Sequence, residues 1–276
     1  MQVNPTALHK KITPIVKKAE KIMLDAYHGT VKVFSKEGEN SAVSIVTATD
    51  REVDAFLRQE LTKVLPGSGF ITEETKDKNP NADYVFIIDP IDGTANFANH
   101  IPIFGISLAL WFKGKPVYGV LSFPEIGETV HAIKGQGVFY NNKPFSRPKN
   151  SAKNRRNEIT SLYCQPERFE KRLRTFEKVK DLIAFPQDYR SASYHFALIS
   201  LGRFDCVFIV NLPIWDFAAG ILIAEEAGLY NAFLTPFPDL AQPDFRDYKN
   251  SFVMAEKEIA LRIAALLKAL SFHNDI

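Results

Sequence analysis

The sequence contains only two cysteines, Cys164 and Cys206, among its 276 residues. Both lie in apolar, strand-like stretches, so we expect two buried thiols rather than a disulfide, and a sulfur-based metal site would need more ligands. The sequence also lacks an apolar run of the roughly 20 residues that cross a bilayer. Its polar, basic beginning lacks the apolar core of a secretory signal. These absences argue against a membrane partner and lead us to expect a cytoplasmic, reducing location.

An excess of charge of one sign is absent as well. The 34 basic and 32 acidic residues leave a net charge of +2, which is too small to recruit a nucleic acid polymer. No Gly-x-x-x-x-Gly-Lys-Ser/Thr motif occurs, and this excludes a P-loop kinase. The length and the hydrophobic content of 46% suffice for a sizeable core in one compact unit of two packed halves, residues 1–145 and 146–276.

The first half has the pattern of an α+β arrangement. Two helical patterns come first, and Pro14 should kink the earlier one or delay its start. Short apolar runs with turn signals between them, such as Asn141-Asn142, then predict an antiparallel meander. The helices are expected at residues 6–27 and 50–65, and the strands at residues 84–88, 106–112, 117–122 and 129–133.

The second half follows a polar link and alternates strands with helices, as in an α/β arrangement. The combined fold class is therefore mixed, α+β followed by α/β. The strands are expected at residues 159–164, 182–185, 204–210 and 251–255, and the helices at residues 168–179, 191–201, 217–227 and 256–270.

The most informative segment reads Ile-Ile-Asp-Pro-Ile-Asp-Gly-Thr-Ala-Asn-Phe. An apolar strand pattern ends in Asp89 and Asp92, and the Ile91 carbonyl supplies a third oxygen between them. Mg²⁺ takes such hard oxygen ligands and keeps open positions for phosphate. Gly93 lets the backbone approach closely, and Thr94 offers a hydroxyl where a helix start would favour an anion. The segment predicts a metal and phosphate site, although Asp-Pro and Asp-Gly steps are also common turn formers.

Three further carboxylates lie in comparable contexts, and two of them fit a helix start as well. Glu73 follows the short apolar step Gly-Phe-Ile-Thr. Asp216 begins an apolar helix, where it could be the N-cap. Asp50 begins the second helix, where Thr49 and Glu52 fit a capping box. Taken singly, each acid fits a structural role at least as well as a functional one.

Four segments in order, Val-Thr-Ala-Thr-Asp, Gly-Phe-Ile-Thr-Glu-Glu, Asp-Pro-Ile-Asp-Gly-Thr and Trp-Asp-Phe-Ala-Ala-Gly, resemble the inositol monophosphatase family over most of the chain. The resemblance implies a layered α-β-α-β-α sandwich, a homodimer, and hydrolysis of a small phosphate ester with two or three Mg²⁺ ions, for which Mn²⁺ could substitute. By position it implies metal binding by Glu73, Asp89, the Ile91 carbonyl, Asp92 and Asp216, a water-orienting pair of Thr94 and Asp50, and a phosphate cradle formed by the Gly93 and Thr94 amides.

The chemistry of a phosphate monoester agrees with these roles. The substrate is negatively charged, so metals must neutralise it, and two metals about 3.5–4 Å apart can hold the attacking and leaving oxygens in line. Glu73 with Asp89 would hold the ion that activates water, Asp92 with Asp216 would hold the second ion, and Asp89 would bridge both. A haloacid-dehalogenase-type phosphatase is excluded because its acids are spaced Asp-x-Asp, whereas two residues separate the acids here.

The chain departs from the family pattern at the substrate end. An ungapped alignment puts Ile209 where inositol-selective members carry a glutamate, and a site without that acceptor discriminates poorly in favour of a polyol. The usual Gly-Ser/Thr-Ala step reads Arg190-Ser191-Ala192, in which Arg190 either suits a second phosphate or a carboxylate or is an ordinary surface cation. We therefore expect a bisphosphorylated sugar or nucleotide to be a better substrate than inositol 1-phosphate. The expected substrate contacts are these four residues together with Asp92, Gly93 and Thr94.

Two alternatives to a phosphatase remain open on the sequence. One is a non-catalytic regulatory protein that retains the fold and binds a protein partner, and the presence of every acid that catalysis needs disfavours it. The other is an acid-lined site for a structural Ca²⁺. An assay of Mg²⁺-dependent phosphate release separates the phosphatase from both alternatives.

Overall fold

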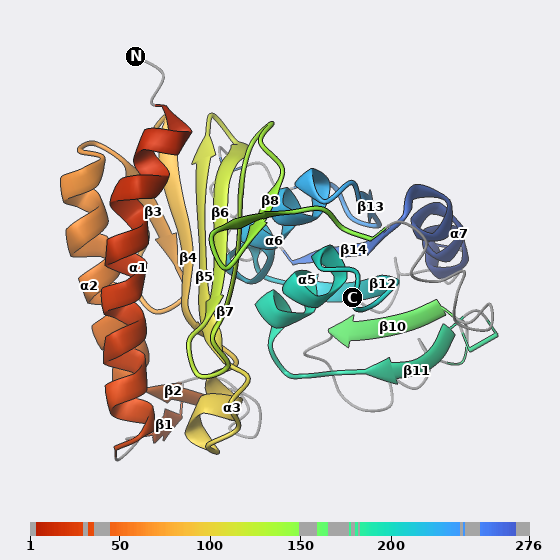
Figure 1. Cartoon of the computed structure of the whole chain (residues 1–276), viewed down its shortest axis with the longest axis horizontal. Coiled ribbons are helices and arrows are strands. Elements are labelled where there is room, and N and C mark those ends of the chain that lie inside the picture. Colours follow the sequence, from red (N-terminus) through yellow and green to blue (C-terminus); the bar gives the residue numbers. More distant parts are fainter. Residues whose placement is uncertain are drawn as a thin grey trace.

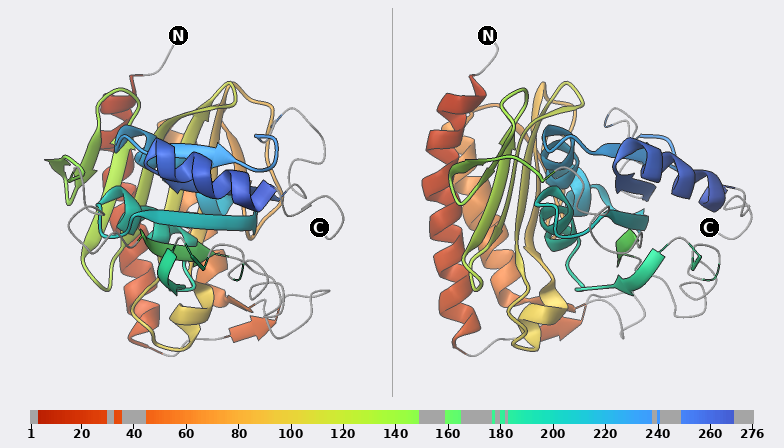
Figure 2. Two further views of the ribbon diagram at one scale, coloured as in Figure 1. Left: turned by 90° about the vertical axis from the view of Figure 1, so that its right-hand side faces the viewer. Right: turned by 45° about the vertical axis from the view of Figure 1, so that its right-hand side comes forward.

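A computed structural model of the protein describes residues 4–29, 33–35, 45–148, 159–164, 177, 180–181, 183–237, 240 and 249–268. Two long helices, a seven-stranded sheet, two inner helices, a five-stranded sheet and a C-terminal helix follow one another across Figure 1. The two further views in Figure 2 show the same layers. The predicted α-β-α-β-α sandwich is thereby confirmed, whereas the helix expected at residues 168–179 falls almost entirely outside the described residues. Among the described residues, no helix is both long enough and apolar enough to cross a membrane.

The outer layer consists of α1 (Pro5–Tyr27) and α2 (Ala48–Val64), which pack against each other. Of the two expectations for Pro14, the delayed start is wrong, because α1 begins at Pro5. Asn4 caps the helix upstream of it, with its side-chain oxygen 3.0 Å from the Thr6 N–H. Pro14 also lies on the exposed side of α1, where water can bond to the carbonyl that the missing N–H leaves without a partner.

The larger sheet has the strand order β3-β4-β5-β6-β7-β8-β9. β3 runs parallel to β4, and every later pair is antiparallel, so the predicted meander is confirmed and extended by strands that the sequence patterns missed. The last hairpin turns at Asn141 and Asn142, whose φ angles are 47° and 63°, as in a type I′ turn. The strands are β3 (Gly69–Thr72), β4 (Tyr84–Asp92), β5 (Gly105–Phe112), β6 (Lys115–Phe123), β7 (Glu128–Ile133), β8 (Val138–Tyr140) and β9 (Lys143–Phe145).

The smaller sheet has the order β11-β10-β12-β14-β13. β10 is parallel to β11 and β12, whereas β14 is antiparallel to both of its neighbours. All four predicted strands are present, and β13 is a short edge strand that the sequence patterns missed. Cys206 of β12 is a free, buried thiol, as expected, and burial raises its pKa. The remaining elements are β10 (Ile159–Cys164), β11 (Ile183–Gln187), β12 (Cys206–Leu212), β13 (Tyr230–Phe233), β14 (Asn250–Ala255), α7 (Lys257–Lys268), α3 (Thr94–Ala98), and the antiparallel pair β1 (Val33–Ser35) and β2 (Ile45–Thr47).

The middle layer consists of α5 (Ala192–Ser200) and α6 (Ile214–Glu226). Almost every residue of α6 is buried, because α6 lies against the larger sheet on one side and also contacts α5 and β13. Gly119 of β6 permits the close approach, since a Cβ there would lie 2.8 Å from the Ala219 carbonyl oxygen of α6. The small residues at this contact thus let α6 pack closely against the larger sheet.

β4 is buried on both faces. Val85 and Ile87 pack with the core around α5 and α6, whereas Phe86 and Ile88 pack with the core around α1 and α2. The residues at the C-terminal end of β4 consequently emerge between the layers of the molecule. This position explains how polar groups of one strand can meet groups from both halves of the chain.

Candidate active site

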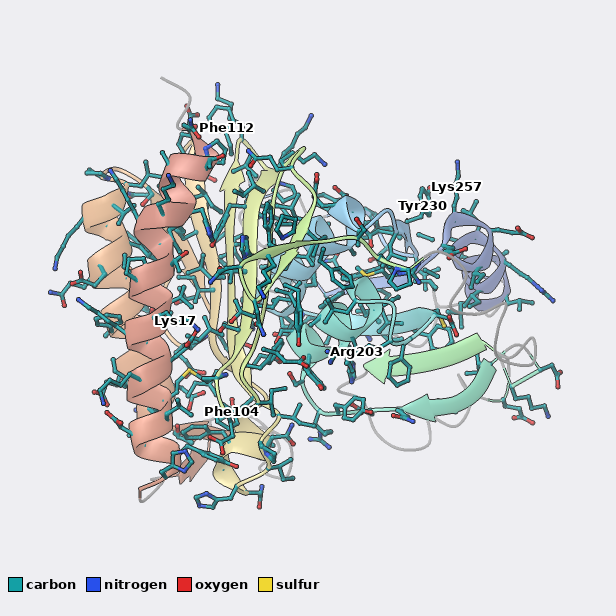
Figure 3. The ribbon with its side chains drawn as sticks, in the orientation of Figure 1. Lys17, Phe104, Phe112, Arg203, Tyr230 and Lys257 are labelled. Carbon is teal, nitrogen blue, oxygen red and sulfur yellow. The ribbon has the colours of Figure 1, made fainter. Side chains whose placement is uncertain are left out.

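The C-terminal end of β4 carries the first two candidate metal ligands. A register shift between Asp89 and Asp92 interrupts the ladder with β5 at this point. Asp89 is 2% exposed and Asp92 is 6% exposed. The Ile91 N–H donates to Asp89 Oδ1 at 3.1 Å, which holds the backbone between the acids in a turn. In Figure 3, Phe104 marks this end of the larger sheet and Phe112 marks the opposite end.

Gly93 and Thr94 lead from β4 into the short helix α3. Gly93 has a φ of 85°, and a Cβ there would lie 2.8 Å from the Ile103 carbonyl oxygen, so both conformation and space require glycine. The Thr94 hydroxyl lies 2.9 Å from the Ile91 carbonyl oxygen and 3.1 Å from Asp50 Oδ1, and these two acceptors share its single hydrogen. The structure therefore brings the expected pair of Thr94 and Asp50 into hydrogen-bond contact.

Asp50 lies in the first turn of α2. The capping box predicted from Thr49 and Glu52 is wrong, because the actual one begins two residues earlier. Thr47, where β2 ends, is the N-cap, and Asp50 is its reciprocal partner. Thr47 donates to Asp50 Oδ2 from its N–H at 2.8 Å and also from its hydroxyl. Burial raises the pKa of Asp50 to about 6, with the Thr47 bonds opposing the rise and the charge of Glu73 adding to it. One carboxylate oxygen of Asp50 thus caps the helix while the other faces the site.

Asp89 is the group on which the other carboxylates act. Burial is the largest cause that raises its pKa well above the ordinary value, and the charges of Glu73, Asp92, Asp216 and Asp50 raise it further. Glu73 reaches this position because β3 is parallel to β4, and its N–H extends that ladder with a bond of 3.2 Å. Five carboxyl groups from four separate segments therefore share one region of the molecule.

Hydrogen-bond donors surround Asp92, in contrast to Asp89. Ser191 and Ser193, at the N-terminus of α5, donate to it through their hydroxyls. The N–H groups of Ala192 and Ser193 lie 3.1 Å and 2.8 Å from its oxygens. These bonds lower the pKa of Asp92, but burial outweighs them and the pKa stays above its ordinary value. Our sequence reasoning missed Ser193, for which the only available signal was a small hydroxyl residue in the first turn of a predicted helix.

Asp216 comes from the other half of the chain, in the first turn of α6. The N-cap role considered for it is wrong, because Pro213 is the N-cap and Asp216 is the third residue of the helix. The side chain of Asp216 is half-buried, and the preceding Trp215 is 8% exposed. The Ser107 hydroxyl of β5 donates to the Trp215 carbonyl oxygen at 3.2 Å. This bond ties the start of α6 to the larger sheet, beside the strand that carries Asp89.

The two residues in which the chain departs from the family pattern differ in their surroundings. Arg190 is exposed and has a φ of 57°, a left-handed conformation that favours glycine, and its N–H donates to Asp188 Oδ1 at 2.8 Å. It immediately precedes the serine that bonds Asp92. Ile209 is 1% exposed and packs in the apolar core around α5 and α6. The expected substrate contact of Ile209 is therefore wrong, because β12 places this side chain in the core.

The donor set around Asp89 fits a hard divalent cation. Within the described ranges, no three His, Cys, Asp or Glu side chains stand close enough to form a ready metal cage. However, a buried carboxylate on which four other carboxylates act is electrostatically unfavourable, and a cation of charge +2 relieves that repulsion. Carboxylate and carbonyl oxygens are the ligands that Mg²⁺ prefers. The residues that fit are Glu73, Asp89, the Ile91 carbonyl, Asp92 and Asp216.

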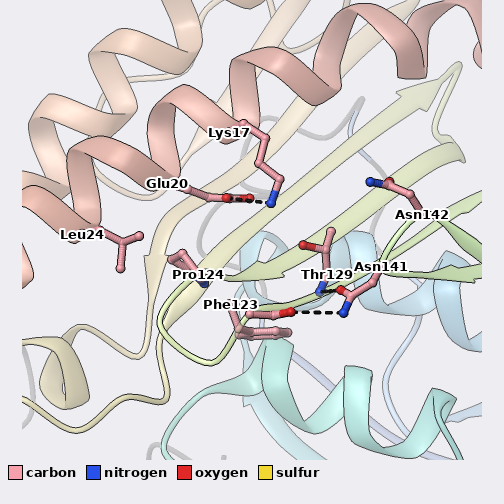
Figure 4. Close-up of a pocket in the computed structure, with 9 residues that line it drawn as sticks. Lys17, Glu20, Leu24, Phe123, Pro124, Thr129, Asn141 and Asn142 are labelled. Atoms are coloured by element: carbon pink, nitrogen blue, oxygen red, sulfur yellow. Dashed lines mark hydrogen bonds and ion pairs between the residues drawn. The ribbon is translucent and has the colours of Figure 1, made fainter.

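A cavity of about 230 Å³ lies on the α1 side of the larger sheet and is not part of this site (Figure 4). Its charged groups already pair, because Glu20 accepts from Lys17 Nζ at 2.8 Å and from the Ser122 hydroxyl at 2.6 Å. Asn141, also on its wall, accepts from the Thr129 N–H at 2.8 Å. None of the carboxylates around Asp89 lines the cavity.

Comparison with known proteins agrees with this geometry. Residues 6–269 match the model of the inositol monophosphatase family. The chain is 32% identical over 235 residues to inositol monophosphatase 2 of Saccharomyces cerevisiae, over 80% of this chain and 77% of that protein. It is also 32% identical over 202 residues to the fructose-1,6-bisphosphatase/inositol-1-monophosphatase of Thermotoga maritima, over 71% and 74% of the two chains.

A solved structure extends the likeness to the whole fold. The extragenic suppressor protein suhB from Bartonella henselae matches with a TM-score of 0.79 at 26% identity, over 95% of this chain and 98% of that one. The family match covers nearly the full length, including every segment that contributes a carboxylate to the region of Asp89. The chain belongs to the inositol monophosphatase family and is a phosphoric monoester hydrolase.

Proposed function

We propose that the protein is a Mg²⁺-dependent phosphomonoesterase that hydrolyses a small polyol, sugar or nucleotide phosphate, with water as the nucleophile. The observation that carries the proposal is the buried Asp89 on which four other carboxylates act. The names of its relatives, inositol monophosphatase and fructose-1,6-bisphosphatase, support this class of substrate. A non-catalytic role is not favoured, because these relatives are phosphatases and the chain retains every acid of the expected site.

The metal ligands of the proposed enzyme are Glu73, Asp89, the Ile91 carbonyl, Asp92 and Asp216. They would hold two or three Mg²⁺ ions, and Mn²⁺ would substitute. Ions bound there would neutralise the phosphate and lower the pKa of a coordinated water.

Thr94 and Asp50 orient the attacking water in this proposal. Asp50 Oδ1 and the Ile91 carbonyl oxygen share the single hydrogen of the Thr94 hydroxyl, so the lone pairs of Thr94 Oγ1 are available to accept a hydrogen from water. With a pKa of about 6, Asp50 is mainly ionised at neutral pH, and its charge keeps the hydroxyl pointing this way. The lone pair of the water is thereby turned toward phosphorus, which the Gly93 and Thr94 amides hold.

The preferred substrate carries a second anionic group. Ser191 and Ala192 hold Asp92, and Arg190 is the exposed residue directly before them. Its guanidinium would pair with a second phosphate or a carboxylate at the rim of the site. A bisphosphorylated sugar or nucleotide is therefore the proposed substrate, ahead of inositol 1-phosphate.

A substrate panel with controlled metal content tests both parts of the proposal. The panel consists of inositol 1-phosphate, fructose 1,6-bisphosphate, NADP⁺, 3′-phosphoadenosine 5′-phosphate, 2′-AMP and histidinol phosphate, each with Mg²⁺, Mn²⁺, Ca²⁺ or EDTA. We expect phosphate release with Mg²⁺ and Mn²⁺, and inhibition by Ca²⁺. No release from any substrate with Mg²⁺ would contradict the enzyme proposal. The highest kcat/KM on inositol 1-phosphate would contradict only the second anionic group.

Two further parts of the proposal concern the protein in the cell. We propose a homodimer, for which light scattering should give twice the molar mass of the chain, and a monomer would contradict it. We also propose a cytoplasmic location, which fractionation of the source cells would test.

A further inference from the structure

One face of α2 carries three charged residues at a spacing of four, Asp50, Asp54 and Arg58. Residues four apart lie above one another on a helix. Asp50 bonds Thr94 at one end of this row. The other two members bond the segment that contains Glu73, one of the candidate metal ligands.

Arg58 contacts the segment around Glu73 through a single nitrogen atom. Its Nη1 lies 2.5 Å from the Thr75 hydroxyl oxygen, 3.2 Å from the Thr72 hydroxyl oxygen and 3.1 Å from the Lys76 carbonyl oxygen. The guanidinium also lies over the ring of Phe70, 5.5 Å from its centroid. The cation is therefore held on one side by β3 and on the other by the residues that follow β3.

Asp54 adds a second contact to the same segment. It is 0% exposed, and its Oδ2 accepts from the Thr75 hydroxyl at 2.7 Å. Its Oδ1 has no hydrogen-bond partner in the described part of the chain. A buried oxygen without a partner costs free energy. The hydrogen bond to Thr75 is therefore the contact that a carboxylate at position 54 contributes in the described part of the chain.

The two anchored threonines bracket Glu73. Thr72 precedes it and Thr75 follows two residues later, and their hydroxyl oxygens are 3.0 Å apart. The Glu73 backbone itself bonds to β4 through its N–H. The segment is thus held by β4 at Glu73 and by α2 on both sides of it. The charge of Glu73 acts on both Asp50 and Asp89.

We propose that Asp54, Arg58 and Thr75 are positioning residues that set the place of Glu73 relative to Asp50. In this arrangement α2 serves as a rigid spacer between the carboxylate that binds metal and the carboxylate that orients water. The inference rests on the proposed metal-dependent function. Contacts that orient metal ligands typically change metal affinity or activity by about 10–100-fold.

The test compares three substitutions by their Mn²⁺ affinity, measured by electron paramagnetic resonance titration without substrate. Thr75→Val keeps the shape of the side chain and removes all three contacts of the hydroxyl, with Arg58, Asp54 and Thr72, and it should weaken Mn²⁺ binding by about 10-fold or more. Thr75→Ser keeps the hydroxyl and should restore the affinity. Thr62→Val is the matched control, because Thr62 lies on α2 with Asp54 and Arg58 but its hydroxyl donates to the Arg58 carbonyl oxygen, at 2.7 Å, and not to the Glu73 segment.

Each outcome decides the inference. Weak Mn²⁺ binding in Thr75→Val alone supports it, and kcat at saturating Mg²⁺ should then fall less than the affinity. Equal Mn²⁺ affinity in Thr75→Val and the unchanged protein would overturn it, whatever happens to the unfolding midpoint. Should Thr75→Val not fold, Arg58→Met against Arg58→Lys gives the same test. Failure of the unchanged protein to bind Mn²⁺ would instead overturn the proposed function and, with it, this inference.

Discussion

Two regions meet at the end of β4 and differ in what they offer. The carboxylate side, formed by Asp50, Glu73 and Asp89, gathers negative charge in a buried space. The donor side, the first turn of α5, surrounds Asp92 with hydroxyl and N–H groups. Burial raises the pKa on both sides, but hydrogen bonds oppose it at Asp92, while neighbouring charges add to it at Asp89.

This difference separates the parts of the proposed chemistry. A cluster of carboxylates requires a cation, so the carboxylate side should control metal dependence and turnover. On the donor side, hydrogen bonds from α5 already hold Asp92, and these bonds join the two halves of the chain. The donor side should therefore control the geometry around the leaving group and the choice of substrate. The variants below are chosen to break one side while leaving the other intact.

Asp89→Asn should have the largest effect, because it removes the ligand expected to bridge two ions. We expect kcat to fall by about 10⁴-fold or more, since a metal ion supplies several kcal/mol of transition-state stabilisation. In EDTA the variant should be more stable than the unchanged protein, because a buried group repelled by four charges has become neutral. Phosphate release and urea unfolding measure the two effects, with the exposed Asp83→Asn as control. Near-normal turnover at saturating Mg²⁺ would remove Asp89 from the mechanism.

Thr94→Ala and Asp50→Asn test the water-orienting pair on the same side. Each should lower kcat on the order of 10²–10³-fold, because an orienting hydrogen bond is lost while no metal ligand is removed. The Mg²⁺ concentration for half-maximal activity should change much less. The double variant should lose little more than either single variant, since the two residues act through one hydrogen bond. Losses that multiply in the double variant would show that they act independently.

His195→Gln tests the donor side through the pH dependence of stability, because His195 lies in α5, the helix whose first turn binds Asp92. His195 is fully buried, its Nε2 accepts from the Tyr189 N–H at 2.9 Å, and burial lowers its pKa to about 4. Between about pH 6.5 and pH 4, His195 is therefore protonated in the unfolded chain and neutral in the folded chain. The stability that His195 contributes is complete above pH 6.5, and up to about 3 kcal/mol of it is lost as the pH falls to 4.

Glutamine at this position can accept the same N–H without titrating. The free energy of unfolding of His195→Gln, measured in urea from pH 7 to pH 4, should fall less steeply than that of the unchanged protein. Asp50 acts in the opposite direction in this range, because its raised pKa favours the folded state as the pH falls, so only the difference between the two proteins isolates His195. Identical pH profiles would contradict the assignment. The exposed His100→Gln serves as control.

Arg190→Gly should have the smallest effect and the most selective one. Glycine adopts the left-handed backbone without strain, so the unfolding free energy should change by less than about 1 kcal/mol. The kcat/KM for a bisphosphate should fall by about 10-fold relative to that for a monophosphate, the value of one charge-assisted bond. Unchanged relative kcat/KM values would show that Arg190 is an ordinary surface cation.

The elements that local pattern predicts well are those with strong periodicity and clear ends. β4 was expected because an apolar run stops at two acids, and α2 because its apolar stripe ends at Pro66-Gly67. Local competition accounts for the errors. The capping box was placed at Thr49 instead of Thr47, because either threonine has an acid three residues later. The edge strand β13 has four residues, too few to show a period.

Reading along the chain was enough to find the four motifs of the family, because each motif is short and the motifs follow one another in order. The resemblance then implied the layered fold and the carboxylates of the expected site. The groups that surround each acid follow from the folded arrangement and not from residue order. The Ser191 and Ser193 hydroxyls reach Asp92 across about 100 residues of sequence, and Arg58 holds the Glu73 segment through Thr75. Tertiary structure also decided that Ile209 lies in the core while Arg190 is exposed. Burial and the electrostatic field of neighbouring charges depend on three-dimensional packing. They exist only in the folded protein and therefore cannot be deduced from the order of the residues.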